Sequence, residues 1–300
     1  MYAWGDDMSD WARPSAYSFK GSRKARAARK EAAKESEQRG GRRYLNRATP
    51  DMDLVSPFGK TLSTESANPI VVAVDVTGSM STWPAEIFDR LPLLYQTLSQ
   101  YRPDLEVSFV AIGDATCDSY PLQVTDFAAG VRLEDQLNAL YGEGGGGGGA
   151  RESYELFAYY LLTHARAHSA ARPFLILYGD EGFYEQVSAA QIRYHLGGKE
   201  RRDRDSAEVW SALNESWNIY HLRKRYHGKD AEIRAQWSEV LGPERVLALP
   251  APERAVDMAL GLIARAWGHY EDFEDNMLAR QPEASVAELR QRLEAAGDVA

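Results

Sequence analysis

Residues 71–81, VVAVDVTGSMS, run from four apolar residues into an acid, two hydroxyls and a glycine. An unbroken apolar run of this kind is typical of a strand that is buried on both faces of a parallel sheet. The pattern recurs along the chain and predicts strands at residues 69–76, 105–113, 173–180, 217–225 and 245–250. Residues 120–127 follow the strand predicted at residues 105–113 after a short polar turn, so we expect an antiparallel edge strand there.

Helical patterns separate these runs. We expect helices at residues 85–101, 150–168, 188–196, 206–215, 229–241 and 253–268. Alternating strands and helices imply right-handed crossovers. The predicted fold class is therefore α/β, a doubly wound, mostly parallel central sheet with helices on both faces. Ligands of such sheets bind at the carboxyl ends of the central strands.

Three segments are expected along the chain. Residues 1–66 read as a basic extension with one helix near residues 21–38, and residues 67–268 as the sheet domain. Residues 269–300 read as an acidic linker and a final helix that begins near Ser285, with Glu288 completing a capping box. Leu289 and Leu293 form one apolar stripe on that helix, which we expect to pack back on the domain.

Composition and charge narrow the class of protein. The chain has 300 residues, 44% of them hydrophobic and 26% charged, with no apolar run long enough to span a membrane. The first residues lack the basic-then-apolar layout of a signal peptide, so a cytoplasmic protein is expected. The single cysteine, Cys117, excludes an internal disulfide and a cysteine-based zinc cluster, and is expected to be a small buried apolar residue, not a reactive thiol.

The net charge of −9 is unevenly distributed. Eleven Lys or Arg and three Glu lie between Lys20 and Arg47, so this segment carries +8 and the rest of the chain −17. Such a segment could bind nucleic acid, an acidic partner or the chain's own acidic body, and composition does not separate the three. The alternative is a solvated, partly helical arm without a binding role.

Oxygen-bearing side chains gather where two predicted strands end. Asp75, Thr77 and Ser79 alternate at the end of the first strand, and Asp180 ends the strand at residues 173–180. Hard oxygen ligands suit Mg²⁺, Mn²⁺ or Ca²⁺, and two carboxylates at one sheet edge would repel without a cation or a proton between them. Alternatively, Asp75 or Thr77 caps the following helix, and Asp180 is a turn residue before Gly182.

Six consecutive glycines, Gly144–Gly149, precede the helix predicted from residue 150. They permit close approach to a ligand, although a plain flexible connector is the alternative. No Gly-Lys-Ser/Thr follows, so the segment is not a phosphate-binding P-loop.

These three features resemble the von Willebrand factor A (VWA) family and its metal-ion-dependent adhesion site, over roughly residues 67–268. The sequence DVTGSMS matches the family's D-x-[S/T]-x-S pattern, and LYGDEG matches its Asp-Gly strand end. The resemblance implies that Thr77 and Ser79 ligate the metal directly, Asp75 directly or through water, and Asp180 as a further, often water-mediated, ligand.

One position departs from the family pattern. Ala150 stands where the resemblance places a threonine ligand, and alanine cannot coordinate a metal. Glu152 or Glu143 substitutes, a water fills the position, or the metal binds weakly or not at all. We expect a weakened site that is still present, with Glu152 as a candidate ligand.

The resemblance implies a binding module in which a partner's acidic side chain completes the coordination of Mg²⁺ (or Mn²⁺/Ca²⁺). It also suggests an intracellular bacterial protein that acts beside a MoxR-type AAA+ ATPase in stress or defence. The rim of such an interface would include four residues that flank the proposed metal edge, for which ordinary packing is the alternative: Met80, Ser81, Trp83 and Phe183.

Two other function classes compete with this interpretation. A Mg²⁺-dependent phosphohydrolase or phosphotransferase of the haloacid dehalogenase type also places an acid at its first strand end, but it needs a second aspartate where this chain has Thr77. A nucleic-acid effector would act through residues 20–47, which contain no recognisable nucleic-acid module.

Overall fold

The computed structural model describes residues 49–80, 82–144 and 149–296. Its central sheet has six strands in the order β12-β11-β7-β2-β3-β4. The first five of these are parallel neighbours, and β4 runs antiparallel to β3 at the edge. This confirms the predicted doubly wound, mostly parallel α/β sheet with an antiparallel edge strand. The strands are β2 (Ile70–Asp75), β3 (Val107–Ile112), β4 (Leu122–Val124), β7 (Phe174–Gly179), β11 (Asn218–Arg223) and β12 (Val246–Ala248).

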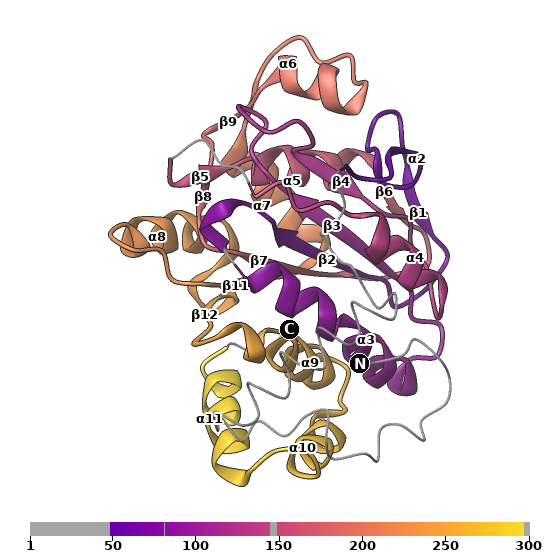
Figure 1. Cartoon of the computed structure of the whole chain (residues 1–300), viewed down its shortest axis with the longest axis vertical. Coiled ribbons are helices and arrows are strands. Elements are labelled where there is room, and N and C mark those ends of the chain that lie inside the picture. The colour runs from indigo at the N-terminus through magenta and orange to yellow at the C-terminus, as the bar shows by residue number, and fades with distance from the viewer. Residues whose placement is uncertain (1–48, 81, 145–148, 297–300) are drawn as a thin grey trace.

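Helices cover both faces of the sheet, as Figure 1 shows. Alternate residues of β2 enter different cores: Ile70, Val72 and Val74 pack on one face, and Val71 and Ala73 on the other. Complete burial on both sides explains why the strand has no polar alternation. The first face carries α3 (Trp83–Tyr101), α4 (Arg132–Ala139) and α9 (Ala255–Ala266), and the second carries α5 (Tyr154–His164), α7 (Ser206–Ser216) and α8 (Asp230–Leu241).

The carboxyl ends of three neighbouring strands meet at one edge of the sheet. In the register, Val74 of β2 lies opposite Tyr178 of β7, and Gly179 of β7 lies opposite Arg223 of β11. The residues that directly follow β7 and β11 are Asp180 and Lys224. Parallel pairing therefore brings both side chains to the edge at which Asp75 ends β2.

Several elements differ from the sequence prediction. The short helix α4 was not predicted, and α5 ends at His164 where a helix to residue 168 was expected. Residues Ala165–Ala167 instead form β6, which pairs in parallel with β1 (Leu62–Thr64). The helix predicted at residues 188–196 is α6 (Ala189–Gln191) followed by a π-helical turn, Ile192–Leu196. Pairing with β1, which is distant in sequence, therefore outweighs the helical pattern of residues 165–167.

Residues 49–66, expected as part of the extension, join the fold where the structure describes them. They contain α2 (Met52–Val55) and β1, and bury Val55 and Leu62. Lys60 Nζ forms an ion pair with Asp126 at 2.8 Å and donates a hydrogen bond to the Val124 carbonyl of β4 at 2.9 Å. The helix predicted near residues 21–38 and the whole basic segment at residues 20–47 lie outside the described part of the chain, which begins at residue 49.

The chain continues after α9 into two helices, α10 (Tyr270–Leu278) and α11 (Glu283–Glu294). The acidic stretch expected as a linker before the final helix is therefore mostly helical, because α10 occupies it. The capping box predicted at Ser285 is wrong, because α11 already begins at Glu283, with Pro282 in the N-cap position at φ −59°. Leu289 and Leu293 are buried in the core that α9 shares, which confirms that the apolar stripe packs back on the domain. None of the described helices combines the length and the apolar character that crossing a bilayer requires.

Cys117 is exposed, so the expectation of a buried apolar residue is wrong. It lies in a turn after β3 in which Asp114 accepts hydrogen bonds from the Thr116 backbone N–H and hydroxyl. The polar turn keeps the thiol at the surface.

Candidate functional site

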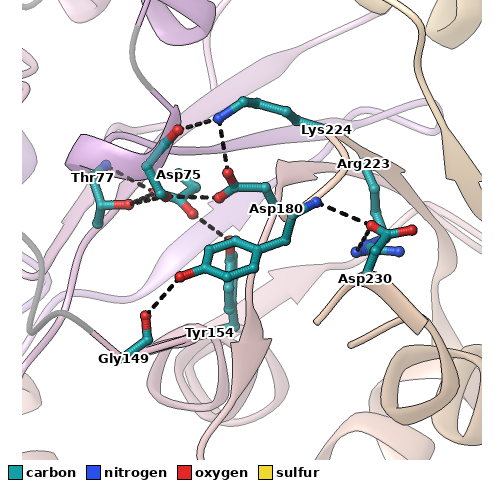
Figure 2. A network of polar contacts seen from close by, with 10 residues as sticks. Asp75, Thr77, Gly149, Tyr154, Asp180, Arg223, Lys224 and Asp230 are labelled. Carbon is teal, nitrogen blue, oxygen red and sulfur yellow. Dashed lines mark hydrogen bonds and ion pairs between the residues drawn. The ribbon is translucent and has the colours of Figure 1, made fainter. Parts of the chain in front are cut away.

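Asp75 is completely buried at the end of β2 and is held by three hydrogen bonds. Its Oδ1 accepts from the Thr77 backbone N–H at 2.8 Å and from Thr77 Oγ1 at 2.6 Å. Its Oδ2 accepts from the hydroxyl of Tyr154, the first residue of α5, at 2.5 Å. The carboxylate is therefore fixed between the turn after β2 and the helix that follows the glycine segment (Figure 2).

The hydrogen bonds continue from Thr77 to the neighbouring strand end. Thr77 Oγ1 lies 3.2 Å from Ser79 Oγ, and Ser79 Oγ donates to Asp180 Oδ1 at 2.8 Å. Ser79 belongs to the 3₁₀ turn Gly78–Met80, which follows β2 and aims the hydroxyl across the edge. The structure thus joins Asp75, Thr77, Ser79 and Asp180 in one chain of oxygen atoms, as the sequence predicted for residues on two strand ends.

A lysine that the sequence prediction missed completes this group. Lys224 Nζ lies 3.0 Å from Asp180 Oδ2 and also donates a hydrogen bond to the Ser79 carbonyl oxygen. The Lys224 backbone N–H donates to the Gly179 carbonyl at 3.0 Å, so the ladder between β11 and β7 positions this residue. The feature that could have identified Lys224 is its place directly after β11, because the carboxyl end of β11 is next to that of β7.

Burial raises the pKa of Asp75 to about 7, and the charge of Asp180 adds to the shift, whereas the Thr77 and Tyr154 hydrogen bonds oppose it. Removing a carboxylate from water disfavours its charged form unless a cation is close by. A positive charge at this edge would therefore stabilise both carboxylates.

Glu152, the remaining candidate ligand, is not hydrogen-bonded to the four residues of the chain described above. It is 2% exposed in β5 (Arg151–Glu152), which pairs with β8 (Gly182–Phe183). Burial and the neighbouring carboxyl of Glu181 raise the pKa of Glu152 well above its usual range. Its role as a metal ligand remains a prediction.

Ala150 and Glu143 do different things in the structure. The Ala150 carbonyl accepts from the Gly182 N–H at 2.9 Å, and its side chain has no ligand atom. Glu143 accepts from the backbone N–H groups of Ser119 and Tyr120 at 2.8 and 2.9 Å. Its carboxylate therefore holds the turn after β3.

The predicted rim residues also differ from one another. Met80 and Phe183 are buried in the two cores, so packing accounts for both. Trp83 is partly buried and lines a cavity of about 420 Å³ beside the candidate site, together with Lys224, Arg225, Ala248, Leu249, Pro250 and Arg292. Ser81 lies outside the described residues.

The donor set fits a hard divalent cation. Two hydroxyls and two carboxylates converge through contacts of 2.6–3.2 Å, and such oxygens are the ligands that Mg²⁺ and Ca²⁺ prefer. Within residues 49–296, leaving out the gaps at 81 and 145–148, no three His, Cys, Asp or Glu side chains are grouped to hold a metal. A metal at this edge would therefore depend on the hydroxyls of Thr77 and Ser79 as well as on the carboxylates.

Comparison with known proteins gave structural likenesses only. No protein-family model and no curated protein matches the chain. The chain is similar to the pilus adhesin SpaC of Lactobacillus rhamnosus GG, at TM-score 0.45 and 12% identity over 72% of this chain and 32% of the adhesin. It is also similar to proximal thread matrix protein 1 of the mussel byssus, at TM-score 0.46 and 9% identity over 70% of this chain and 49% of that protein.

A von Willebrand factor type A protein from Catenulispora acidiphila gives a TM-score of 0.38 at 18% identity, over 68% of this chain and 43% of its own length. The SpRpn10 VWA domain gives 0.39 at 8% identity, over 64% of this chain and 94% of its own. The chain thus spans a third to a half of the first two proteins named above.

Proposed function

We propose that this chain is a VWA-type binding module. In this proposal Asp75, Thr77, Ser79 and Asp180 bind a divalent cation, and the cation binds an acidic side chain of a protein partner. The observation that carries the proposal is the chain of contacts from Asp75 through Thr77 and Ser79 to Asp180, which gathers the D-x-T-x-S oxygens and a second carboxylate at one sheet edge. Mg²⁺ is the first candidate ion, with Mn²⁺ and Ca²⁺ as alternatives.

The chemistry of the donors favours binding over turnover. Thr77 occupies the position where a haloacid dehalogenase-type enzyme needs a second aspartate, and its hydroxyl donates to Asp75. A hydroxyl does not serve as the acid/base that this reaction needs. The neutral hydroxyls leave part of the cation's charge uncompensated, and an incoming carboxylate would supply the missing negative charge.

Ala150 makes the proposed cation site weaker than a site with one more hydroxyl ligand. A partner's carboxylate therefore contributes a larger share of the coordination, and we expect metal affinity and partner affinity to be thermodynamically linked. The sequence resemblance suggests a MoxR-type AAA+ ATPase of a bacterial cytoplasm, and we include this class of protein in the proposal as the partner.

Calorimetric titration of Mg²⁺ and then Mn²⁺ into chelator-treated protein tests the cation. We expect saturable heat in the wild type, and its loss in Asp75→Ala and Ser79→Ala. Ser119→Ala is the matched control, because Ser119 is exposed and uses its backbone N–H, not its side chain, to bind Glu143. A wild type that gives no saturable heat with either ion would contradict the proposal.

A phosphate-release assay in Mg²⁺, run on the same preparations, separates binding from hydrolysis. The proposal expects no turnover of a general phosphomonoester such as p-nitrophenyl phosphate. Turnover that disappears in Asp75→Ala would replace the binding module with a phosphohydrolase.

A further inference from the structure

The ammonium of Lys224 lies where the candidate site would need a cation. It contacts Asp180 Oδ2 at 3.0 Å and the Ser79 carbonyl, while Ser79 Oγ donates to the other oxygen of the same carboxylate. Asp180 is 1% exposed, so Lys224 supplies a counter-charge that solvent cannot.

We propose that Lys224 is a tethered competitor of the divalent cation. The lysine closes the site when the ion is absent, and it is displaced when the ion binds. This inference rests on the proposed metal site and deepens it, because it names the residue that sets the affinity for the ion.

Electrostatics make the two occupants mutually exclusive. A divalent cation coordinated by Ser79 and Asp180 would lie within a few ångströms of Nζ in its present position. Two like charges at that distance repel strongly at the effective dielectric constant near a protein surface, and the double charge of the ion doubles the repulsion. The lysine must therefore withdraw before or while the ion enters, and the cost of its withdrawal lowers the apparent affinity.

The surroundings of Lys224 allow that withdrawal. Its backbone is fixed by the hydrogen bond to Gly179, whereas its side chain is 24% exposed and has four rotatable methylene links. The cavity of about 420 Å³ that Trp83, Arg225 and Arg292 help to line opens beside it. The side chain can turn into this space without any movement of β11.

The displaced ammonium would add to the charge of Arg225 in the cavity lining, whereas Arg292 in that lining is paired with Glu288 at 3.2 Å. None of the described residues that line this cavity is acidic. Ion entry would therefore make the surface beside the site more basic and more favourable to an acidic partner.

The test is calorimetric titration of Mg²⁺ and Mn²⁺ into the full chelator-treated chain, with the wild type, Lys224→Gln, Lys224→Arg and Lys199→Gln compared. Lys199 is exposed and lies in the loop after Leu196, so Lys199→Gln loses the same charge away from the site. We expect the dissociation constant of Lys224→Gln to fall at least tenfold. Lys224→Arg, which keeps the charge, and Lys199→Gln should stay within about threefold of the wild type.

A melting curve with chelator present supplies the second measurement. Without metal, Lys224→Gln should melt below the wild type because Asp180 has lost its counter-charge, and Mg²⁺ should raise its melting temperature more than that of the wild type. A merely structural lysine would lower the melting temperature without improving metal affinity.

The outcomes distinguish this inference from the proposed function. Equal affinity of wild type and Lys224→Gln would overturn the competition and leave the metal site intact. Binding by Lys224→Gln alone would support the competition but contradict the proposed function, because the native lysine would then keep the ion out of the wild-type site. Binding by neither protein would overturn both.

Discussion

The Tyr154 hydroxyl donates a hydrogen bond of 2.5 Å to Asp75 Oδ2, and both side chains are completely buried. This contact ties the end of β2 to the first turn of α5, which follows the glycine segment and β5. The position of Asp75 at the candidate site therefore depends on the packing of a helix from another part of the chain.

Tyr154→Phe removes this donor and leaves a buried carboxyl oxygen without it. We expect a loss of about 1–3 kcal/mol in the free energy of unfolding, measured by urea denaturation. Tyr160→Phe is the matched control on the same helix, because the buried Tyr160 hydroxyl has no hydrogen-bond partner among the described residues. Similar losses in the two variants would show that the Asp75 contact adds nothing to stability.

Gly179→Ala tests the close approach of β7 to the same tyrosine. A Cβ at Gly179 would overlap the Tyr154 hydroxyl and lie 2.9 Å from Tyr154 Cζ. We expect a destabilisation of about 1–3 kcal/mol, the usual cost of overpacking, and partial rescue by Tyr154→Phe. Gly149→Ala is the control, since its nearest neighbour would be Arg151 N at 3.9 Å.

Glu155→Gln should change the dependence of stability on pH. Burial raises the pKa of Glu155 to about 8 from its ordinary 4.5, although backbone N–H groups, including that of Tyr184, bind its carboxylate. The stabilising contribution of the protonated form is complete below about pH 4.5 and is lost as the pH rises through 8.

Thermal melting between pH 5 and 9 checks this prediction. Wild-type stability should fall over that range by an amount on the order of a few kcal/mol from this group, and the fall should be smaller in Glu155→Gln. Glu232→Gln, at an exposed position, should follow the wild-type curve. Parallel curves for wild type and Glu155→Gln would contradict the assigned cause.

Leu293→Ala tests the docking of α11. Leu293 is fully buried against α9, where its side chain closely approaches Gly261. We expect a loss of about 2–5 kcal/mol in the free energy of unfolding, because the deletion removes apolar contact and leaves a cavity. Leu278→Ala, at a residue that is 43% exposed, should cost far less.

The sequence predicted the sheet because its strands carry their signal locally. Val71 to Val74 are apolar without interruption, and burial on both faces requires that pattern. The pairing of β6 with β1 left no such signal, because Ala165–Ala167 extends a helical pattern and its partner lies in a polar segment. A contact between distant segments decided the structure there.

The candidate site shows the same division. Asp75, Thr77, Ser79 and Asp180 could be found because each follows an apolar run that ends at the same sheet edge. Lys224 falls within the predicted strand at residues 217–225, whereas β11 ends two residues before that range does, at Arg223. Tyr154 required the three-dimensional position of α5, which the sequence alone does not provide.

The central claim is that a divalent cation binds among these oxygens, and a crystal grown with Mn²⁺ tests it most directly. The account predicts an anomalous difference peak about 2.0–2.3 Å from Thr77 Oγ1 and Ser79 Oγ, with the Lys224 side chain turned away from Asp180. A map without a peak at this edge, in which Lys224 still contacts Asp180, would contradict it.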